Sequence, residues 1–168
     1  IYFSYASQSD YTTSTMLRAT KKGEVRAMLC LSLTLVAYLM LKRYQIETLF
    51  FAIAMGLSSI LNPVLKNIFD RERPTLLRLI DISGFSFPSG HAMGATSYFG
   101  SIIYILNRHD SGISKGVLIG LSALFILLIS TSRVYLGVHY PTDIIAGIIG
   151  GAFCIVLSTL ILKKQLAI

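Results

Sequence analysis

Charged residues are scarce in this sequence. Only 14% of its 168 residues are charged, with 15 basic and 8 acidic side chains. Ordinary soluble domains carry about 25% charged residues, whereas this chain is 54% hydrophobic and has a mean hydropathy of +0.67. So few charges cannot cover a water-exposed surface around this much apolar sequence. The composition therefore argues against a soluble domain and favours insertion into a lipid bilayer.

Cysteine is also nearly absent. The two cysteines, Cys30 and Cys154, lie inside apolar stretches, form no CxxC pair and have no histidine nearby in the sequence. We expect both to be small buried apolar residues, and they indicate no particular redox compartment.

The basic excess gives a net charge of +7. Its residues flank apolar stretches or lie in one central loop, a pattern that suits membrane borders and an anionic ligand better than a duplex-binding face. No aromatic-plus-basic ladder or nucleic-acid motif is visible, so we expect no nucleic-acid partner.

Five apolar stretches indicate membrane-spanning helices. They cover residues 27–41, 48–65, 92–107, 116–132 and 144–162. A bilayer core needs about 20 apolar residues, so some helix ends are expected to extend into the charged loops. Small residues that would let helices approach closely are Gly120, Gly147, Gly150 and Gly151. The prediction is an all-α, polytopic membrane helix bundle with five spans, forming one domain over residues 1–168.

The first 24 residues differ from the rest because they are rich in Ser, Thr and Tyr. They are interpreted as an interfacial helix or as a loop that follows a missing upstream span. The chain begins at Ile1 and not at Met, which fits the second alternative.

Counting crossings brings the informative polar residues to one side of the membrane. If each stretch crosses once, the second ends, the third begins, the fourth ends and the fifth begins on the same side. The residues gathered there are Lys66, Arg73, Ser89, His91, Arg133, His139 and Asp143. Charge counting does not decide which side is cytoplasmic, because equal numbers of Lys and Arg remain on both sides once the three candidate ligand-binding residues are left out.

Three of these residues, Lys66, Arg73 and Arg133, supply fixed positive charge. The planar Arg guanidinium matches phosphate oxygens, and Lys acts as a compact point charge. Ser89 adds a hydroxyl, and Gly90 lies at the expected start of a helix, where free N–H groups favour an anion. This pattern predicts a phosphate site that needs no metal ion and no other cofactor.

Two histidines on one anion site are its sharpest feature. Asp143 follows His139 by four residues, so one helical turn would let the carboxylate orient the imidazole for attack on phosphorus. His91 would then protonate the leaving oxygen and later activate water. Taken singly, each residue has an ordinary structural role as a membrane-border anchor, turn residue or N-cap, so the argument depends on their conjunction.

The same residues resemble the type 2 phosphatidic acid phosphatase superfamily, whose motifs are KxxxxxxRP, PSGH and SRxxxxxHxxxD. They read here as Lys66 to Arg73-Pro74, Pro88 to His91, and Ser132-Arg133 to His139 and Asp143. Every specified position matches, in order, within residues 66–143, and the resemblance extends over roughly residues 50–151.

This resemblance implies a six-span fold, one more span than is readable here, and a multi-pass protein of the cell membrane with its site on the extracytoplasmic face. It implies that His139 is the nucleophile, that Asp143 orients it and that His91 is acid and base. It also implies phosphate binding by Lys66, Arg73, Ser89, Gly90 and Arg133. The size is similar to bacterial phosphatases of phosphatidylglycerophosphate and undecaprenyl pyrophosphate, so a lipid phosphate is the expected substrate.

Other functions remain open. A vanadate-dependent haloperoxidase shares the motifs but is soluble, which the apolar stretches contradict. A phosphatase for a non-lipid ester and a non-catalytic lipid-phosphate binding or transport protein would share the fold. In the central loop, Arg71, Arg78, Phe85 and Phe87 are candidates for the site entrance or for ordinary loop packing.

Overall fold

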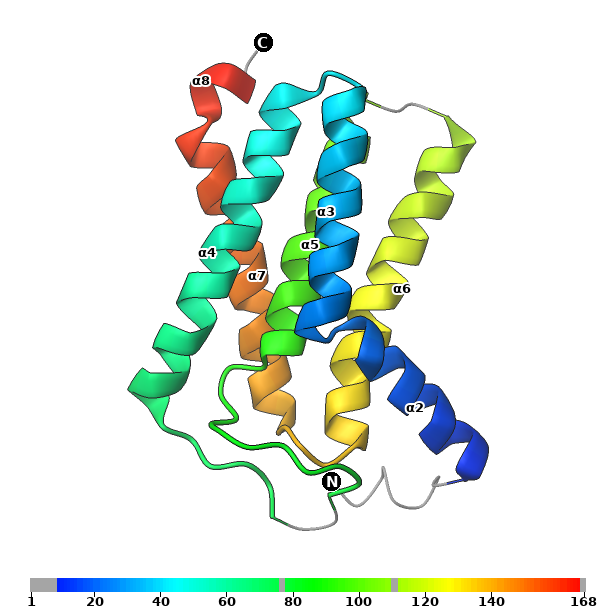
Figure 1. Cartoon of the computed structure of the whole chain (residues 1–168), viewed down its shortest axis with the longest axis vertical. Coiled ribbons are helices and arrows are strands. Elements are labelled where there is room, and N and C mark those ends of the chain that lie inside the picture. Colours follow the sequence, from blue (N-terminus) through cyan, green and yellow to red (C-terminus); the bar gives the residue numbers. More distant parts are fainter. Residues whose placement is uncertain (1–8, 76–77, 110–111, 167–168) are drawn as a thin grey trace.

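The helices of the computed structural model run side by side and form one bundle (Figure 1). The structure describes residues 9–75, 78–109 and 112–166, and these residues contain no β-strand. The helices are α2 (Asp10–Lys22), α3 (Val25–Leu41), α4 (Gln45–Phe69), α5 (Gly90–His109), α6 (Ile113–Tyr135), α7 (Pro141–Ile161) and α8 (Lys163–Leu166). Helices α3 to α7 occupy the five predicted stretches and extend beyond most of their ends. The predicted all-α membrane helix bundle is confirmed.

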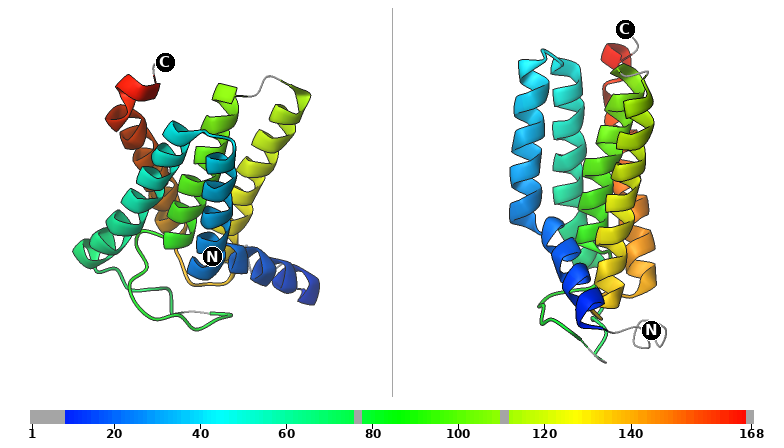
Figure 2. Two further views of the ribbon diagram at one scale, coloured as in Figure 1. Left: turned by 45° about the horizontal axis from the view of Figure 1, so that its top comes forward. Right: turned by 90° about the vertical axis from the view of Figure 1, so that its right-hand side faces the viewer.

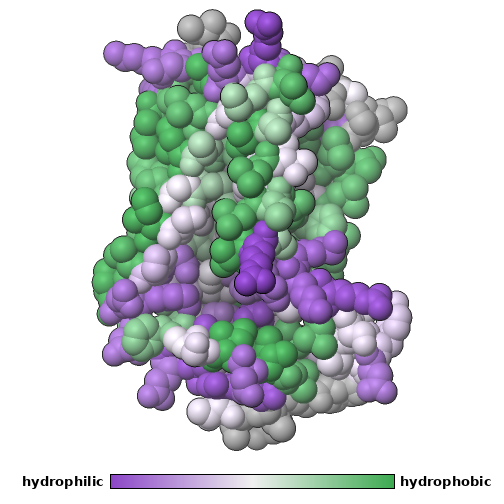
Figure 3. Space-filling view, viewed as in Figure 1, coloured by the Kyte–Doolittle hydropathy of each residue, from purple (hydrophilic) through white to green (hydrophobic). Residues whose placement is uncertain are grey.

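Three helices, α4, α6 and α7, are long and apolar enough to cross a membrane, and the pair α2 and α3, bent by 54°, makes a fourth candidate. Figure 2 shows α2 turning away from the axis of α3. Apolar side chains cover the middle of the visible face, and hydrophilic residues gather toward its two ends (Figure 3). Large exposed apolar residues on these helices include Leu33, Ile60, Leu127, Ile149 and Phe153. This distribution suits lipid on the outside of the bundle.

Helix α5 differs from the outer helices in that it packs against four others, α3, α4, α6 and α7. Ser97 and Ser101 are fully buried in it, and Thr96 is nearly so. Their small polar side chains lower the hydropathy of a helix that has little lipid to face. This explains why α5 is absent from the candidate spans although it lies in the bundle centre.

Glycines of α7 set its close approach to α5. A Cβ on Gly147 would lie 2.7 Å from the backbone oxygen of Ser89, and one on Gly151 would lie 2.7 Å from that of Met93. Gly150 also touches α5, with 3.3 Å to the Met93 side chain. The prediction for Gly120 is wrong, because a Cβ there would meet nothing within 4 Å. Sequence alone does not tell a lipid-facing glycine from one at a helix crossing.

Gly151→Ala is expected to lower the free energy of unfolding by about 1–3 kcal/mol, because the new methyl group must push α5 away from α7. Gly120→Ala is the matched control. It makes the same change in an open helical position and should be neutral or slightly stabilising. Thermal unfolding of both variants in detergent measures the difference, and equal midpoints would contradict the crossing geometry.

The two ends of the bundle are held differently. The larger apolar cluster, which includes Leu39, Phe50, Phe51, Tyr98 and Ile105, lies toward the end where α3 joins α4 (Figure 1). At the other end, the last residue of α6 and residues that follow it form a smaller cluster with side chains of α2 and of the loop 70–89. Its members are Tyr135, Leu136 and Val138, packed against Met16, Leu17, Ile80 and Ile82. This packing fixes the short connection to α7.

The predictions for the first 24 residues and for the two cysteines have different outcomes. Residues 10–22 form the helix α2, whereas residues 1–8 lie outside the described residues. Cys154 is buried as predicted, but Cys30 is exposed. The prediction for Cys30 is wrong because α3 is an outer helix, and an apolar stretch reads the same whether a side chain faces protein or lipid.

Candidate active site

The seven polar residues that the order of spans predicts on one side do lie at one end of the bundle, where α4 and α6 end and α5 and α7 begin (Figure 1). The loop 70–89 crosses this end. Ser89, Arg133, His139 and Asp143 are almost completely buried, and Arg73 is 9% exposed. Burial of this many polar groups requires that they bind one another or a ligand.

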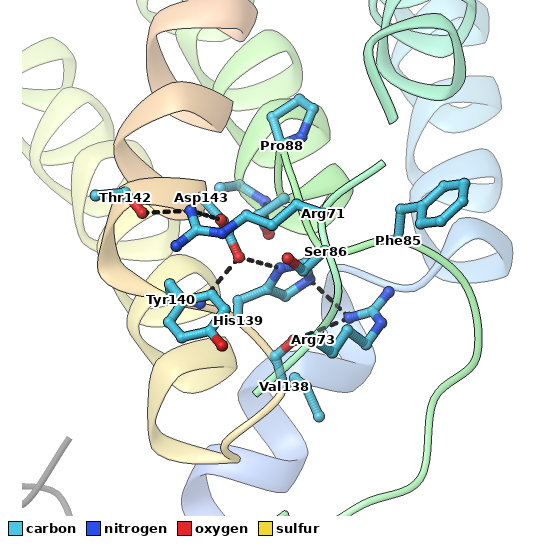
Figure 4. A network of polar contacts seen from close by, with 12 residues as sticks. Arg71, Arg73, Phe85, Ser86, Pro88, Val138, His139, Tyr140, Thr142 and Asp143 are labelled. Atoms are coloured by element: carbon cyan, nitrogen blue, oxygen red, sulfur yellow. Dashed lines mark hydrogen bonds and ion pairs between the residues drawn. The ribbon is translucent and has the colours of Figure 1, made fainter. Parts of the chain in front are cut away.

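His139 lies between a carboxylate and a guanidinium (Figure 4). Its Nδ1 is 3.3 Å from Oδ2 of Asp143, and its Nε2 is 3.2 Å from Nη1 of Arg73. The carboxylate makes Nδ1 the protonated nitrogen, since a carboxylate accepts and does not donate. Nε2 therefore carries the lone pair and points toward Arg73.

Asp143 occupies the first turn of α7, where its Oδ2 also accepts the backbone N–H of Tyr140 at 2.9 Å. Pro141 begins the helix, a position where its missing N–H costs nothing. The backbone N–H of Ser89 donates to the Asp143 carbonyl at 3.0 Å. The close crossing of α5 and α7 thus joins the segment Pro88–His91 to the His139–Asp143 pair.

Arg73 joins the loop 70–89 to the connection before α7. Its Nε donates to the Gly84 carbonyl at 2.8 Å, and its Nη1 donates to the Val138 carbonyl at 3.0 Å. Burial, with the charge of nearby Arg78, lowers the pKa of Arg73 from its ordinary value, but a guanidinium stays charged. Arg73 is therefore a fixed positive charge beside Nε2 of His139.

Lys66, His91 and Arg133 complete the group. Nζ of Lys66, in the last turn of α4, donates to the Phe85 carbonyl at 2.5 Å. His91 lies within electrostatic range of Lys66, Arg73, Arg133 and His139. Its Nε2 and the Nε of Arg133 are buried without a hydrogen-bond partner among the described residues. The Nε–H of Arg133 is a donor that an anion would need, and His91 Nε2 can donate or accept according to its tautomer.

Burial, opposed by the hydrogen bond to Asp143 and reinforced by Arg73, Arg133 and Lys66, lowers the pKa of His139 to about 4. The imidazole is therefore neutral at neutral pH, the form in which nitrogen can act as a nucleophile. Among the described residues, no group of three or more His, Cys, Asp and Glu side chains is arranged to hold a metal ion.

The bend between α2 and α3 contributes contacts that the motifs do not reveal. Thr20 Oγ1 accepts from Nη1 of Arg133 at 2.5 Å. A Cβ on Gly23 would lie 2.8 Å from the ring of His91 and 2.6 Å from Ile129, so the bend needs glycine there. The segment that the sequence left as a loop or interfacial helix therefore lies directly against the candidate site.

A cavity of about 490 Å³ opens beside His91, between α3, α4 and α5. Met28, Leu29 and Met55 give it an apolar wall, and Asn62 and Gly90 line it near the loop 70–89. The cavity is therefore lined by His91 of the polar site and by apolar side chains of α3 and α4, two helices with exposed apolar residues.

Comparison with known proteins identifies relatives of the chain and of its fold. The sequence profile of the PAP2 superfamily matches residues 47–166. The chain is 34% identical to phosphatidylglycerophosphatase B of Bacillus subtilis over 134 residues, which are 79% of this chain and 66% of that protein. It is also 34% identical to undecaprenyl-diphosphatase of Sulfolobus acidocaldarius over 110 residues, 64% of this chain and 50% of that protein. The matches span between 43% and 66% of the curated relatives' lengths.

Two solved structures share the fold. The crystal structure of a transmembrane PAP2-type phosphatidylglycerolphosphate phosphatase from Bacillus subtilis matches with a TM-score of 0.87 and 30% identity, over 97% of this chain and 82% of that chain. Aquifex aeolicus LpxE matches with a TM-score of 0.76 and 21% identity, over 93% of this chain and 90% of that chain. Together with the apolar helices, the first match supports a multi-pass membrane protein.

Proposed function

Because the chain belongs to the PAP2 superfamily, we propose that it is a membrane lipid phosphatase that hydrolyses a lipid phosphomonoester or diphosphate through a phosphohistidine at His139. The observation that carries this proposal is the placement of His139 between Asp143 and Arg73, and the low pKa that burial gives His139 agrees with it. One partner fixes the protonated nitrogen, and the other would hold a phosphate at the nitrogen that carries the lone pair.

In the proposed first step, Nε2 of His139 forms a bond to phosphorus while the bond to the leaving oxygen breaks. His91 gives that oxygen a proton. In the second step, His91 takes a proton from water, the hydroxide oxygen attacks phosphorus and the P–N bond breaks. Asp143 stabilises the positive charge that His139 gains.

Binding of the phosphate is assigned to Lys66, Arg73, Ser89, Gly90 and Arg133. Hydrogen bonds to charged groups contribute about 1.5–3 kcal/mol each, so several together can hold a phosphoryl group. Asp143 is the buried carboxylate at this end of the described bundle, where four buried or half-buried cations also lie, namely Lys66, Arg71, Arg73 and Arg133. This charge balance favours an anion and disfavours a metal cation, so we propose a reaction without a metal ion.

The apolar cavity beside His91 supports a substrate with a hydrocarbon chain. The names of the relatives make phosphatidylglycerophosphate and undecaprenyl pyrophosphate the first candidates. We further propose that the site faces the extracytoplasmic side of the cell membrane. Labelling of Glu72→Cys in intact cells by a membrane-impermeant thiol reagent tests this orientation, in a variant that lacks Cys30 and Cys154.

Phosphate release by detergent-purified protein in EDTA tests the reaction. The substrates are phosphatidylglycerophosphate, undecaprenyl pyrophosphate, phosphatidic acid and the soluble ester p-nitrophenyl phosphate. Release from a lipid that greatly exceeds release from the soluble ester supports a lipid phosphatase. Release that requires an added divalent metal would contradict the mechanism. Lipid binding without release by folded protein would support the alternative, a non-catalytic binding protein.

The low pKa of His139 predicts an unusual pH profile. Protonation removes the nucleophile, so the acid limb of kcat/KM due to His139 should lie near pH 4, not near 6.5, the ordinary value for histidine. Activity should therefore persist as the pH falls from 6.5 toward 4. Rates measured with p-nitrophenyl phosphate must be corrected for the second phosphate pKa, about 6. A remaining limb near 6.5 would contradict a buried, neutral His139.

A further inference from the structure

Asp143 uses its two carboxylate oxygens for different tasks. Its side chain is fully buried. Oδ2 faces Nδ1 of His139 and the N–H of Tyr140. Oδ1 faces a residue outside the motifs, because Nη1 of Arg71 donates to it at 2.9 Å.

Arg71 is held by three groups at once (Figure 4). The same Nη1 donates to Oγ1 of Thr142 at 2.8 Å. The guanidinium carbon lies 4.2 Å from the ring centroid of Tyr140, so the group stacks on that ring. These contacts all come from the start of α7, while Arg71 belongs to the loop 70–89. The guanidinium therefore has one defined position against the turn that carries Asp143.

We propose that Arg71 is a positioning residue, which fixes the carboxylate of Asp143 so that its second oxygen holds the Nδ1–H of His139. This inference rests on the proposed function of His139 as nucleophile. Arg71 acts through Asp143 and does not need to touch the substrate.

The weak restraint on His139 makes this role necessary. The distance of 3.3 Å between His139 Nδ1 and Asp143 Oδ2 is longer than most N–H···O bonds, which lie near 2.9–3.0 Å. Without Arg71, Oδ1 would be a buried oxygen without its charged partner, and the carboxylate could rotate toward other donors. A rotation would loosen the imidazole and misdirect Nε2. A lysine at this position would supply charge but could not stack on Tyr140 in the same way.

Five variants test the proposal in p-nitrophenyl phosphate and lipid assays, and one of them is Asp143→Asn alone. Arg71→Met removes the donor and keeps an unbranched side chain, and Arg71→Lys restores one charge. Arg18→Met is the matched control, because Arg18 is an exposed arginine of α2 outside the site. The double variant Arg71→Met/Asp143→Asn tests whether Arg71 works through Asp143.

Arg71→Met should lower kcat by about 10- to 100-fold, the size of loss that follows removal of the outer partners that orient metal-binding histidines. KM should change by less than about threefold, since a transition-state effect lowers kcat and kcat/KM together. Arg71→Lys should recover part of the loss, and Arg18→Met should match the parent protein. The double variant should have the same kcat as Asp143→Asn alone, because Arg71 acts through Asp143.

Two results would overturn the inference. Arg71 binds substrate directly if Arg71→Met mainly raises KM and if the fold-loss in kcat/KM of the double variant is the product of the two single losses. If kcat of a folded Arg71→Met protein is unchanged, Arg71 has no part in positioning. Thermal unfolding midpoints of all variants identify any loss caused by misfolding. Failure of the parent protein to release phosphate would instead reject the proposed function.

Discussion

Replacing His139 by alanine is expected to abolish phosphate release while the protein remains folded. Loss of a nucleophile costs a factor of about 10⁴ or more in kcat, and no other side chain presents an unprotonated nitrogen to Arg73 in the described site. The fold should survive because the neighbours keep other partners. Arg73 retains the Gly84 and Val138 carbonyls, and Asp143 retains Arg71 and the Tyr140 N–H.

The assay for this variant is phosphate release in EDTA, combined with trapping of a phosphoenzyme from substrate labelled at phosphorus. The chain offers a control in its third histidine. His109 lies at the opposite end of the bundle, where its Nε2 is 2.7 Å from Glu47, so His109→Gln should keep activity. A folded His139→Ala protein that retains more than about 1% of parent kcat would reject the nucleophile assignment.

The helices that span the bundle could be predicted from the sequence because their apolar stretches are bounded by charged or turn-forming residues. The helix α2 could not be assigned in this way. Its Ser- and Thr-rich sequence is held by tertiary contacts, as when Tyr135 of α6 lies 2.9 Å from Thr12 and 3.0 Å from Thr13. A local pattern cannot report partners more than 100 residues away in the sequence.

The sequence predicts two things about the candidate site. The motifs identify its residues, and the order of the spans predicts that these residues lie on one side of the membrane. What the motifs omit is the support around them, above all Arg71, Thr20 and Gly23. One signal for Arg71 was present. Residues i and i+2 of an extended segment lie on the same side, and the residue before a proline is extended, so Arg71 and Arg73 could be placed together with Glu72 opposite.

Asp143→Asn is the second substitution with a very large expected effect, and its reason lies in the direction of one hydrogen bond. Asparagine has nearly the shape of aspartate, but one of its two oxygens becomes an NH₂ group. Arg71 donates to the first oxygen, so the amide oxygen should turn toward Arg71 and the NH₂ toward His139. His139 must then accept at Nδ1, which puts its proton on Nε2 and removes the lone pair that attacks phosphorus.

Asp143→Asn should therefore lower kcat by about 10⁴-fold, as a wrong tautomer does in a serine protease, with a much smaller change in KM. The NH₂ group would also face the Tyr140 N–H, which now donates to Oδ2, so a modest loss of stability should accompany the loss of activity. Nitrogen-15 chemical shifts of the His139 ring, compared between the two proteins, report the tautomer independently of turnover. A parent-like tautomer with a kcat within tenfold of the parent would contradict the role of Asp143. If Arg71 enforces the amide orientation, removing Arg71 from the Asp143→Asn protein frees the amide to rotate. The double variant should therefore have a kcat no lower than that of Asp143→Asn alone.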